Sequence, residues 1–110
     1  MDRDKAQLIK MREEIPLIEK FVDGMTREDF VSNELIQHAV CMALITIGEC
    51  ANHLSEEFIE NYHQMPWIEI IAVRNISTHG YWQLDMQQIW DAIKEDIPKL
   101  KEFVEEQLGY

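Results

Sequence analysis

The sequence is poor in the residues that interrupt regular structure or cross-link a fold. Three prolines and four glycines among 110 residues are too few for long disordered stretches or for a β-rich pattern of turns. The two cysteines, Cys41 and Cys50, are nine positions apart within one predicted helix, too far to bond to each other. We therefore interpret both as reduced thiols in the core of a cytoplasmic protein.

Basic side chains are scarce relative to acidic ones. Ten lysines and arginines oppose 21 aspartates and glutamates, which gives a formal net charge of −11. A field of this sign repels phosphate backbones and disfavours tight non-specific binding of nucleic acid. A function on nucleic acid would therefore need a local basic pocket, or a partner that offsets the charge.

Long apolar runs are also missing. The N-terminus, Met-Asp-Arg-Asp, is not an apolar signal segment. The longest nearly unbroken apolar run, residues 39–48, is shorter than the roughly 20 residues that span a bilayer. We expect a soluble protein that forms one domain over residues 1–110 and does not contact a membrane.

Apolar residues instead recur at steps of three and four, the spacing of amphipathic helices. Long helices are predicted over residues 4–23, 33–54, 66–79 and 86–108. Short helices are expected after Thr26 and Ser55, and no segment alternates with period two for long enough to be a strand. The sequence predicts an all-α fold, a compact up-and-down bundle of about four main helices plus short helices.

Capping residues and prolines mark where these helices begin and bend. Thr26 opens a capping-box-like sequence, and either Ser32 or Asn33 can cap the second long helix. Pro16 and Pro98 fall inside the first and last helices, where a proline removes a hydrogen bond. We expect a kink at each of them.

The predicted helix 66–79 changes character along its length. Its apolar residues point in nearly every direction, as in a buried helix. Arg74, Asn75, Thr78 and His79 nevertheless fall within one arc of about 140°. Buried polar groups are costly unless they are paired or used. Asn75 lies four positions before His79, where it can orient the imidazole, so this arc is the candidate site.

Histidine and arginine beside an amide suit RNA cleavage without a metal. The substrate would bring its own nucleophile, the 2′-hydroxyl, while His79 acts as general base or acid. Arg74 would hold the phosphate and stabilise developing charge. The two residues diverge by about 140° around the helix, so a second copy across a two-fold axis would complete the groove. His38 and Cys41 lack a second ligand pair, and no metal or cofactor is predicted.

The run Arg74-x4-His79-x-Tyr81 resembles the Arg-x4-His-x-Tyr motif of HepT-like toxins, which belong to the HEPN superfamily. The resemblance extends over nearly the whole chain. Further matching segments are Ile47-Gly48-Glu49, Pro66-Trp67, Ile70-Ile71, Ile89-Trp90 and Asp96-Ile97-Pro98. One stretch departs from the family, since residues 41–45 lack the arginine and glutamate that members often carry there.

The resemblance implies a HEPN-like homodimer with a composite ribonuclease site at its interface. Arg74 and His79 of both chains would be catalytic, with Asn75 and Glu49 in support. It also implies a toxin whose antitoxin is a minimal nucleotidyltransferase that adenylylates the motif tyrosine, here Tyr81. That modification would place bulk and negative charge beside Arg74.

Other interpretations of the same residues stay open from sequence. Arg74 can be a structural cation that pairs with Glu49 or a C-terminal carboxylate, and Glu49 is as readily a surface charge. Tyr81 can be a core aromatic beside Trp82. The whole chain can instead be a non-catalytic, nucleotide- or substrate-binding subunit of a paired nucleotidyltransferase, or a helical dimeric adaptor.

Overall fold

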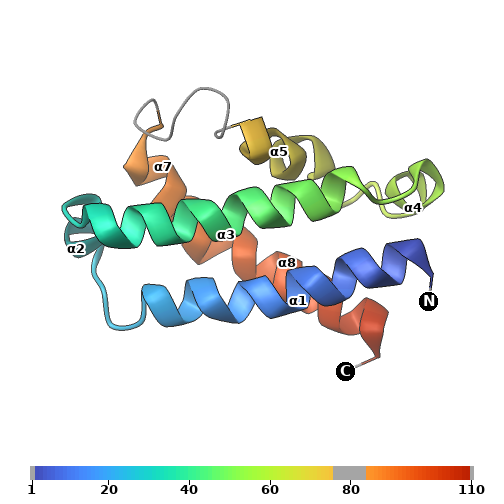
Figure 1. The fold of residues 1–110 in the computed structure, drawn as a ribbon, viewed down its shortest axis with the longest axis horizontal. Helices are drawn as coiled ribbons and strands as arrows, with labels where there is room; N and C mark the ends of the chain where they lie inside the picture. Colours follow the sequence, from blue (N-terminus) through green and yellow to red (C-terminus); the bar gives the residue numbers. More distant parts are fainter. Residues whose placement is uncertain (1, 76–83, 110) are drawn as a thin grey trace.

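The computed structural model describes residues 2–75 and 84–109, and every regular element within these ranges is a helix (Figure 1). The α-helices are α1 (Arg3–Phe21), α2 (Arg27–Val31), α3 (Glu34–Asn52), α4 (Glu56–Asn61), α5 (Trp67–Ala72), α7 (Met86–Asp91) and α8 (Ile97–Leu108). A 3₁₀ turn, η1 (Val73–Asn75), follows α5, and a π-helical stretch, η3 (Ala92–Asp96), joins α7 to α8. The predicted all-α fold is confirmed.

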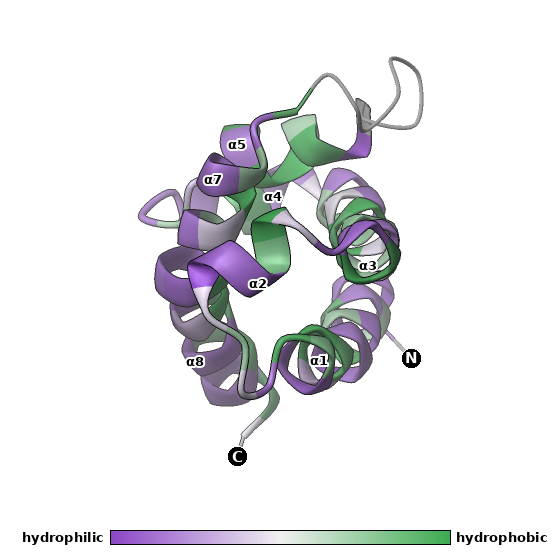
Figure 2. Cartoon of the chain, turned by 90° about the vertical axis from the view of Figure 1, so that its left-hand side faces the viewer, coloured by the Kyte–Doolittle hydropathy of each residue, from purple (hydrophilic) through white to green (hydrophobic). Residues whose placement is uncertain are grey.

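The long helices pack around one core. α3 runs antiparallel to α1 beside it, and α8 packs against α1 (Figure 1). α2 lies across one end of the bundle, between α3 and α7 (Figure 2). The largest fully buried side chains come from α1, α2, α3 and α8, and burying each contributes about 1.5–3 kcal/mol. They are Met11, Ile15, Ile18, Phe30, Val40 and Val104.

Hydrogen bonds confirm the predicted N-caps of α2, α3 and α4. The Thr26 hydroxyl accepts from the Asp29 amide while the Asp29 carboxylate accepts from the Thr26 amide, each at 3.1 Å. Of the two candidates for the cap of α3, Asn33 is the one that caps, with Oδ1 3.0 Å from the Ile36 amide. The Ser55 hydroxyl caps α4 in the same way. These bonds satisfy amides that a helix N-terminus leaves without partners.

The predicted helix 66–79 needs two corrections within its described part. It is α-helical only to Ala72 and tightens into η1 from Val73, so a wheel of 100° per residue does not extend to Arg74. It is also not buried all round, because Ile68 is 82% exposed and only Trp67 is fully covered. An apolar helix face is expected to be buried, but the sequence does not show whether it is buried within the same chain or against another molecule. Residues 76–79 lie outside the described ranges.

The two prolines affect their helices differently. α1 continues through Pro16, which is exposed on its outer side. In the last helix, η3 ends at Asp96, two residues before Pro98. Pro98 has no amide to donate, and its ring crowds the carbonyl four residues earlier, at Lys94. A local widening to π geometry relieves such crowding, and we attribute η3 to it.

Both cysteines are free and buried, as expected from sequence. They lie on α3, which is long and apolar enough to cross a membrane but is about half buried against the rest of the protein, as a core helix would be. Burial raises the pKa of Cys41 to about 11, and burial also raises the pKa of Cys50.

The raised thiol pKa values predict slow alkylation of the folded protein. A Cys41 pKa of about 11 instead of 9.0 leaves roughly a hundredfold less thiolate at pH 8, and the thiolate is the nucleophile. Iodoacetamide labelling followed by mass spectrometry should therefore modify Cys41 far more slowly in the native protein than in urea. Equal rates in the two states would contradict this prediction.

Candidate active site at the edge between α3 and α5

An ion pair joins α3 to the turn that carries Arg74. The Arg74 guanidinium donates through Nη1 to Glu49 Oε1 at 3.1 Å, across 25 residues of sequence. The side chains are 38% and 43% exposed, and a pair this exposed contributes only about 0–1 kcal/mol to stability. The pair fixes where the guanidinium points, and its main effect is therefore on geometry rather than on stability.

A histidine lies beside this pair on the same edge. The His53 Nδ1 donates to the Glu49 carbonyl oxygen at 2.7 Å, and the same nitrogen is 3.9 Å from Glu49 Oε2. The Arg3 Nε donates to the His53 carbonyl oxygen at 3.0 Å, which ties the end of α3 to the start of α1. Sequence patterns did not place His53 at the site, because His53 and Arg74 come together only when the turn that carries Arg74 packs against α3.

The backbones of α3 and α5 approach closely at this point. A β-carbon placed on Gly48 would lie 2.9 Å from the Ile70 carbonyl oxygen and 3.1 Å from the Arg74 amide nitrogen. Such separations are shorter than side-chain carbons tolerate, so the close approach depends on glycine. The sequence carried a signal for it, since a glycine inside an apolar helix usually has a packing reason.

Exposed apolar side chains lead along α3 to the ion pair. Leu35 is 78% exposed, Met42 is 65% exposed, and Glu49 follows seven residues later. Residues seven apart differ by only about 20° around a helix, so these three form one stripe. On the neighbouring α5, Ile68 and Ala72 are also exposed. We call Leu35, Met42 and Ile68 the apolar edge.

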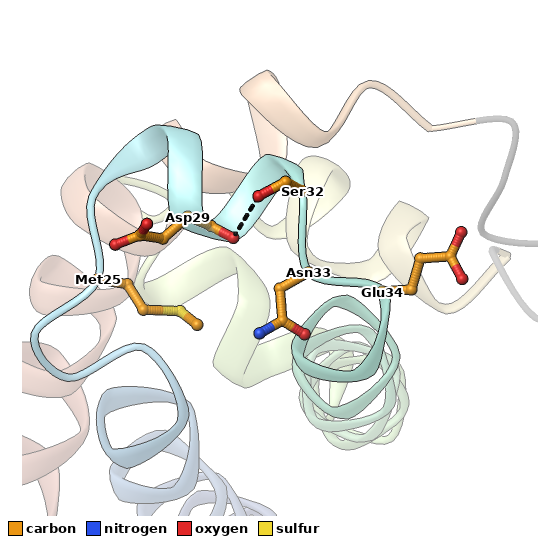
Figure 3. Close-up of a pocket in the computed structure, with 5 residues that line it drawn as sticks. All are labelled: Met25, Asp29, Ser32, Asn33 and Glu34. Atoms are coloured by element: carbon orange, nitrogen blue, oxygen red, sulfur yellow. Dashed lines mark hydrogen bonds between the residues drawn. The ribbon is translucent and has the colours of Figure 1, made fainter.

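A polar hollow between α2 and α3 is explained by helix capping (Figure 3). The Ser32 hydroxyl donates to the carbonyl oxygens of Glu28 and Asp29, at 2.8 and 3.3 Å. The side chains of Asp29 and Asn33 are the cap acceptors described above. Because these polar groups already have hydrogen-bond partners, few of them are left to bind a ligand in the hollow.

The structure thus brings together two of the predicted site residues, Glu49 and Arg74. The side chain of Asn75, and all of His79 and Tyr81, lie outside the described residues. Within the described ranges, no group of three histidine, cysteine, aspartate or glutamate side chains is arranged to hold a metal ion.

Comparison with known proteins identifies the family of this chain. The family described as Ribonuclease HepT-like matches residues 11–107, which include α3, α5 and the ion pair. The chain belongs to the HepT-like ribonuclease family. It is accordingly a ribonuclease, although its formal net charge of −11 disfavours non-specific binding of RNA.

Relatives named as ribonucleases align with most of this HepT-like chain. "Putative RNase MJ1380" of Methanocaldococcus jannaschii is 35% identical over 92% of this chain and 93% of its own length. "Probable ribonuclease HepT" of Thermococcus cleftensis is 36% identical over 88% of each chain. A third, "Gamma-glutamylcyclotransferase and putative RNase MJ0434" of Methanocaldococcus jannaschii, is 38% identical, but the alignment covers 44% of its length. No solved structure gives a significant match.

Proposed function

We propose that this HepT-like ribonuclease is the toxin of a toxin–antitoxin pair, a metal-independent endoribonuclease that acts as a homodimer in the cytoplasm. The observation that carries the proposal is the half-exposed Arg74–Glu49 pair at the end of the apolar edge. An arginine held in place by a carboxylate, with its side chain 38% exposed, is suited to receive a phosphate.

The cleavage step uses groups that the chain and the RNA supply. His79 accepts the proton of the 2′-hydroxyl, and the 2′-oxygen attacks the adjacent phosphorus. The bond from phosphorus to the 5′-oxygen breaks, and the leaving oxygen takes a proton from the second copy's His79. Arg74 stabilises the extra negative charge on the phosphoryl oxygens. The products are a 2′,3′-cyclic phosphate and a 5′-hydroxyl end.

The dimer is proposed because the single chain leaves the apolar edge uncovered. Leu35, Met42 and Ile68 expose large apolar side chains on adjacent helices, and such exposure is typical of an interaction surface. A two-fold interface presents the same residues from both copies. A second copy seated on the edge would bring a second Arg74 toward the first and would exclude water from the pair.

The antitoxin is proposed to be a minimal nucleotidyltransferase that adenylylates Tyr81. An adenylyl group adds bulk and a phosphate charge close in sequence to Arg74, which would then bind that phosphate instead of RNA. A partner more basic than this chain, whose net charge is −11, would also be attracted electrostatically.

Expression in a bacterial host tests this proposal. The chain alone should arrest growth, whereas co-expression with its cognate minimal nucleotidyltransferase should restore growth and leave an adenylyl group on Tyr81, detected by mass spectrometry. The Tyr81→Phe variant should still arrest growth but should no longer be rescued by catalytic amounts of the enzyme. Rescue of Tyr81→Phe at the wild-type level, or unmodified Tyr81 after rescue, would refute the adenylylation step.

A further inference from the structure

Gly48 is the only glycine within α3, and it lies against the point where α5 passes into η1. Glycine is among the least favourable residues in a helix interior. A β-carbon here would meet the Ile70 carbonyl oxygen, the Arg74 amide and, at 3.4 Å, the Arg74 β-carbon. The close contact at Gly48 therefore sets the distance between α3 and the Arg74 backbone.

The N-terminal end of α5 packs against the rest of the protein through Trp67. Trp67 is buried, and its indole Nε1 donates to the Tyr62 carbonyl oxygen at 2.9 Å. Its ring meets Phe103 of α8 edge-on, with centroids 5.6 Å apart, and also contacts Phe58 of α4. The start of α5 is thus held by both α4 and α8.

Within the part of the chain that the structure describes, the end of α5 is not packed against α8 in this way. A groove of about 460 Å³ separates them, lined on one side by Ile70 and Val73 and on the other by Ile97 and Leu100. On its opposite side, the end of α5 meets α3 at Gly48. Among the described elements, α3 is therefore the helix outside α5 that packs most closely against the turn carrying Arg74.

We propose that Gly48 is a positioning residue for RNA cleavage, because its missing side chain lets the Arg74 backbone come close enough for the guanidinium to meet Glu49. Gly48 then allows the close approach of the Arg74 backbone, and the neighbouring Glu49 binds the Arg74 guanidinium. This inference rests on the proposed role of Arg74 in cleavage.

The groove determines what a larger residue at position 48 would do. Alanine would press on the Ile70 carbonyl and the Arg74 amide, and α5 has room to swing toward α8. We expect Gly48→Ala to keep the fold and displace Arg74. A displacement of about 1 Å at a catalytic group is enough to cost on the order of a hundredfold in rate.

The test compares Gly48→Ala with Gly24→Ala in the full chain. Gly24 has φ of +75° and an open surrounding, so alanine there strains the backbone far from α5. Gly48→Ala should lower kcat by about ten- to a hundredfold with a smaller change in KM, while Gly24→Ala should retain wild-type kcat. In a Glu49→Gln background, Gly48→Ala should cost much less, since both act through Arg74.

A second measurement does not depend on cleavage. The ¹⁵N signals of the Arg74 guanidinium, assigned with Arg74→Lys, report whether the pair with Glu49 is formed. Gly48→Ala should change them to resemble those of Glu49→Gln, and Gly24→Ala should leave them unchanged. If wild-type protein cleaves without needing Arg74, the proposed function fails, and these signals still decide the role of Gly48. Wild-type signals in Gly48→Ala, or a Gly48→Ala chain that does not fold, would overturn the inference.

Discussion

Replacing Arg74 with alanine is expected to lower RNA cleavage by about 100- to 1,000-fold, the usual cost of losing a group that stabilises transition-state charge. The fold should survive, because the Arg74–Glu49 pair is too exposed to contribute much stability. The measurement is the initial cleavage rate of an RNA substrate, with circular dichroism to confirm helicity. His79→Ala should lose about 100- to 10,000-fold by removal of the general acid or base.

The chain offers a matched control for Arg74→Ala. Arg27 forms a similar pair with Asp91, at 2.7 Å and with side chains 41% and 49% exposed, but between α2 and α7. Arg27→Ala removes the same charge from the same kind of pair away from α5. It should cleave RNA at close to the wild-type rate. Equal losses in the two variants would mean that Arg74 acts only through overall charge or stability.

The second large effect is expected at the apolar edge. Met42→Glu should convert the dimer to a monomer, because each copy would bury a carboxylate in an apolar interface without a partner. Ile68→Glu should do the same from α5. RNA cleavage should fall with the dimer fraction, since the proposed composite site needs both copies. Light scattering coupled to size-exclusion chromatography measures the mass, and the cleavage assay is run at the same protein concentration.

Leu17→Glu is the control for this effect. Leu17 is also an exposed apolar residue, but it lies on α1 rather than on α3 or α5. This variant should remain a dimer with normal activity. A wild-type chain that is monomeric and fully active, or a Met42→Glu chain that remains dimeric, would contradict the proposed dimer.

Local sequence rules predicted most of the helical framework. The caps at Thr26, Asn33 and Ser55 follow from short-range hydrogen bonding, which sequence spacing describes well. The exposure of Ile68 was not predictable, because periodicity shows that a face is apolar without showing which surface covers it. The change to η1 at Val73 was equally hidden, since it depends on how the end of α5 packs.

The candidate site was predictable only in part, for a related reason. Motif spacing singled out Arg74, but its partner lies 25 residues earlier in another helix. Sequence alone left Glu49 open as a partner or a surface charge. The role of Gly48 depends on the distance between two backbones, which appears only when α3 and α5 are packed together.

The most direct test of the account is to identify the RNA ends that the purified wild-type protein leaves in the presence of a metal chelator. Attack by the 2′-hydroxyl, with Arg74 stabilising the phosphorane, predicts undiminished cleavage that yields 2′,3′-cyclic phosphates and 5′-hydroxyls, and their loss in Arg74→Ala. Cleavage that stops with the chelator, or that leaves 3′-hydroxyl and 5′-phosphate ends, would contradict the account.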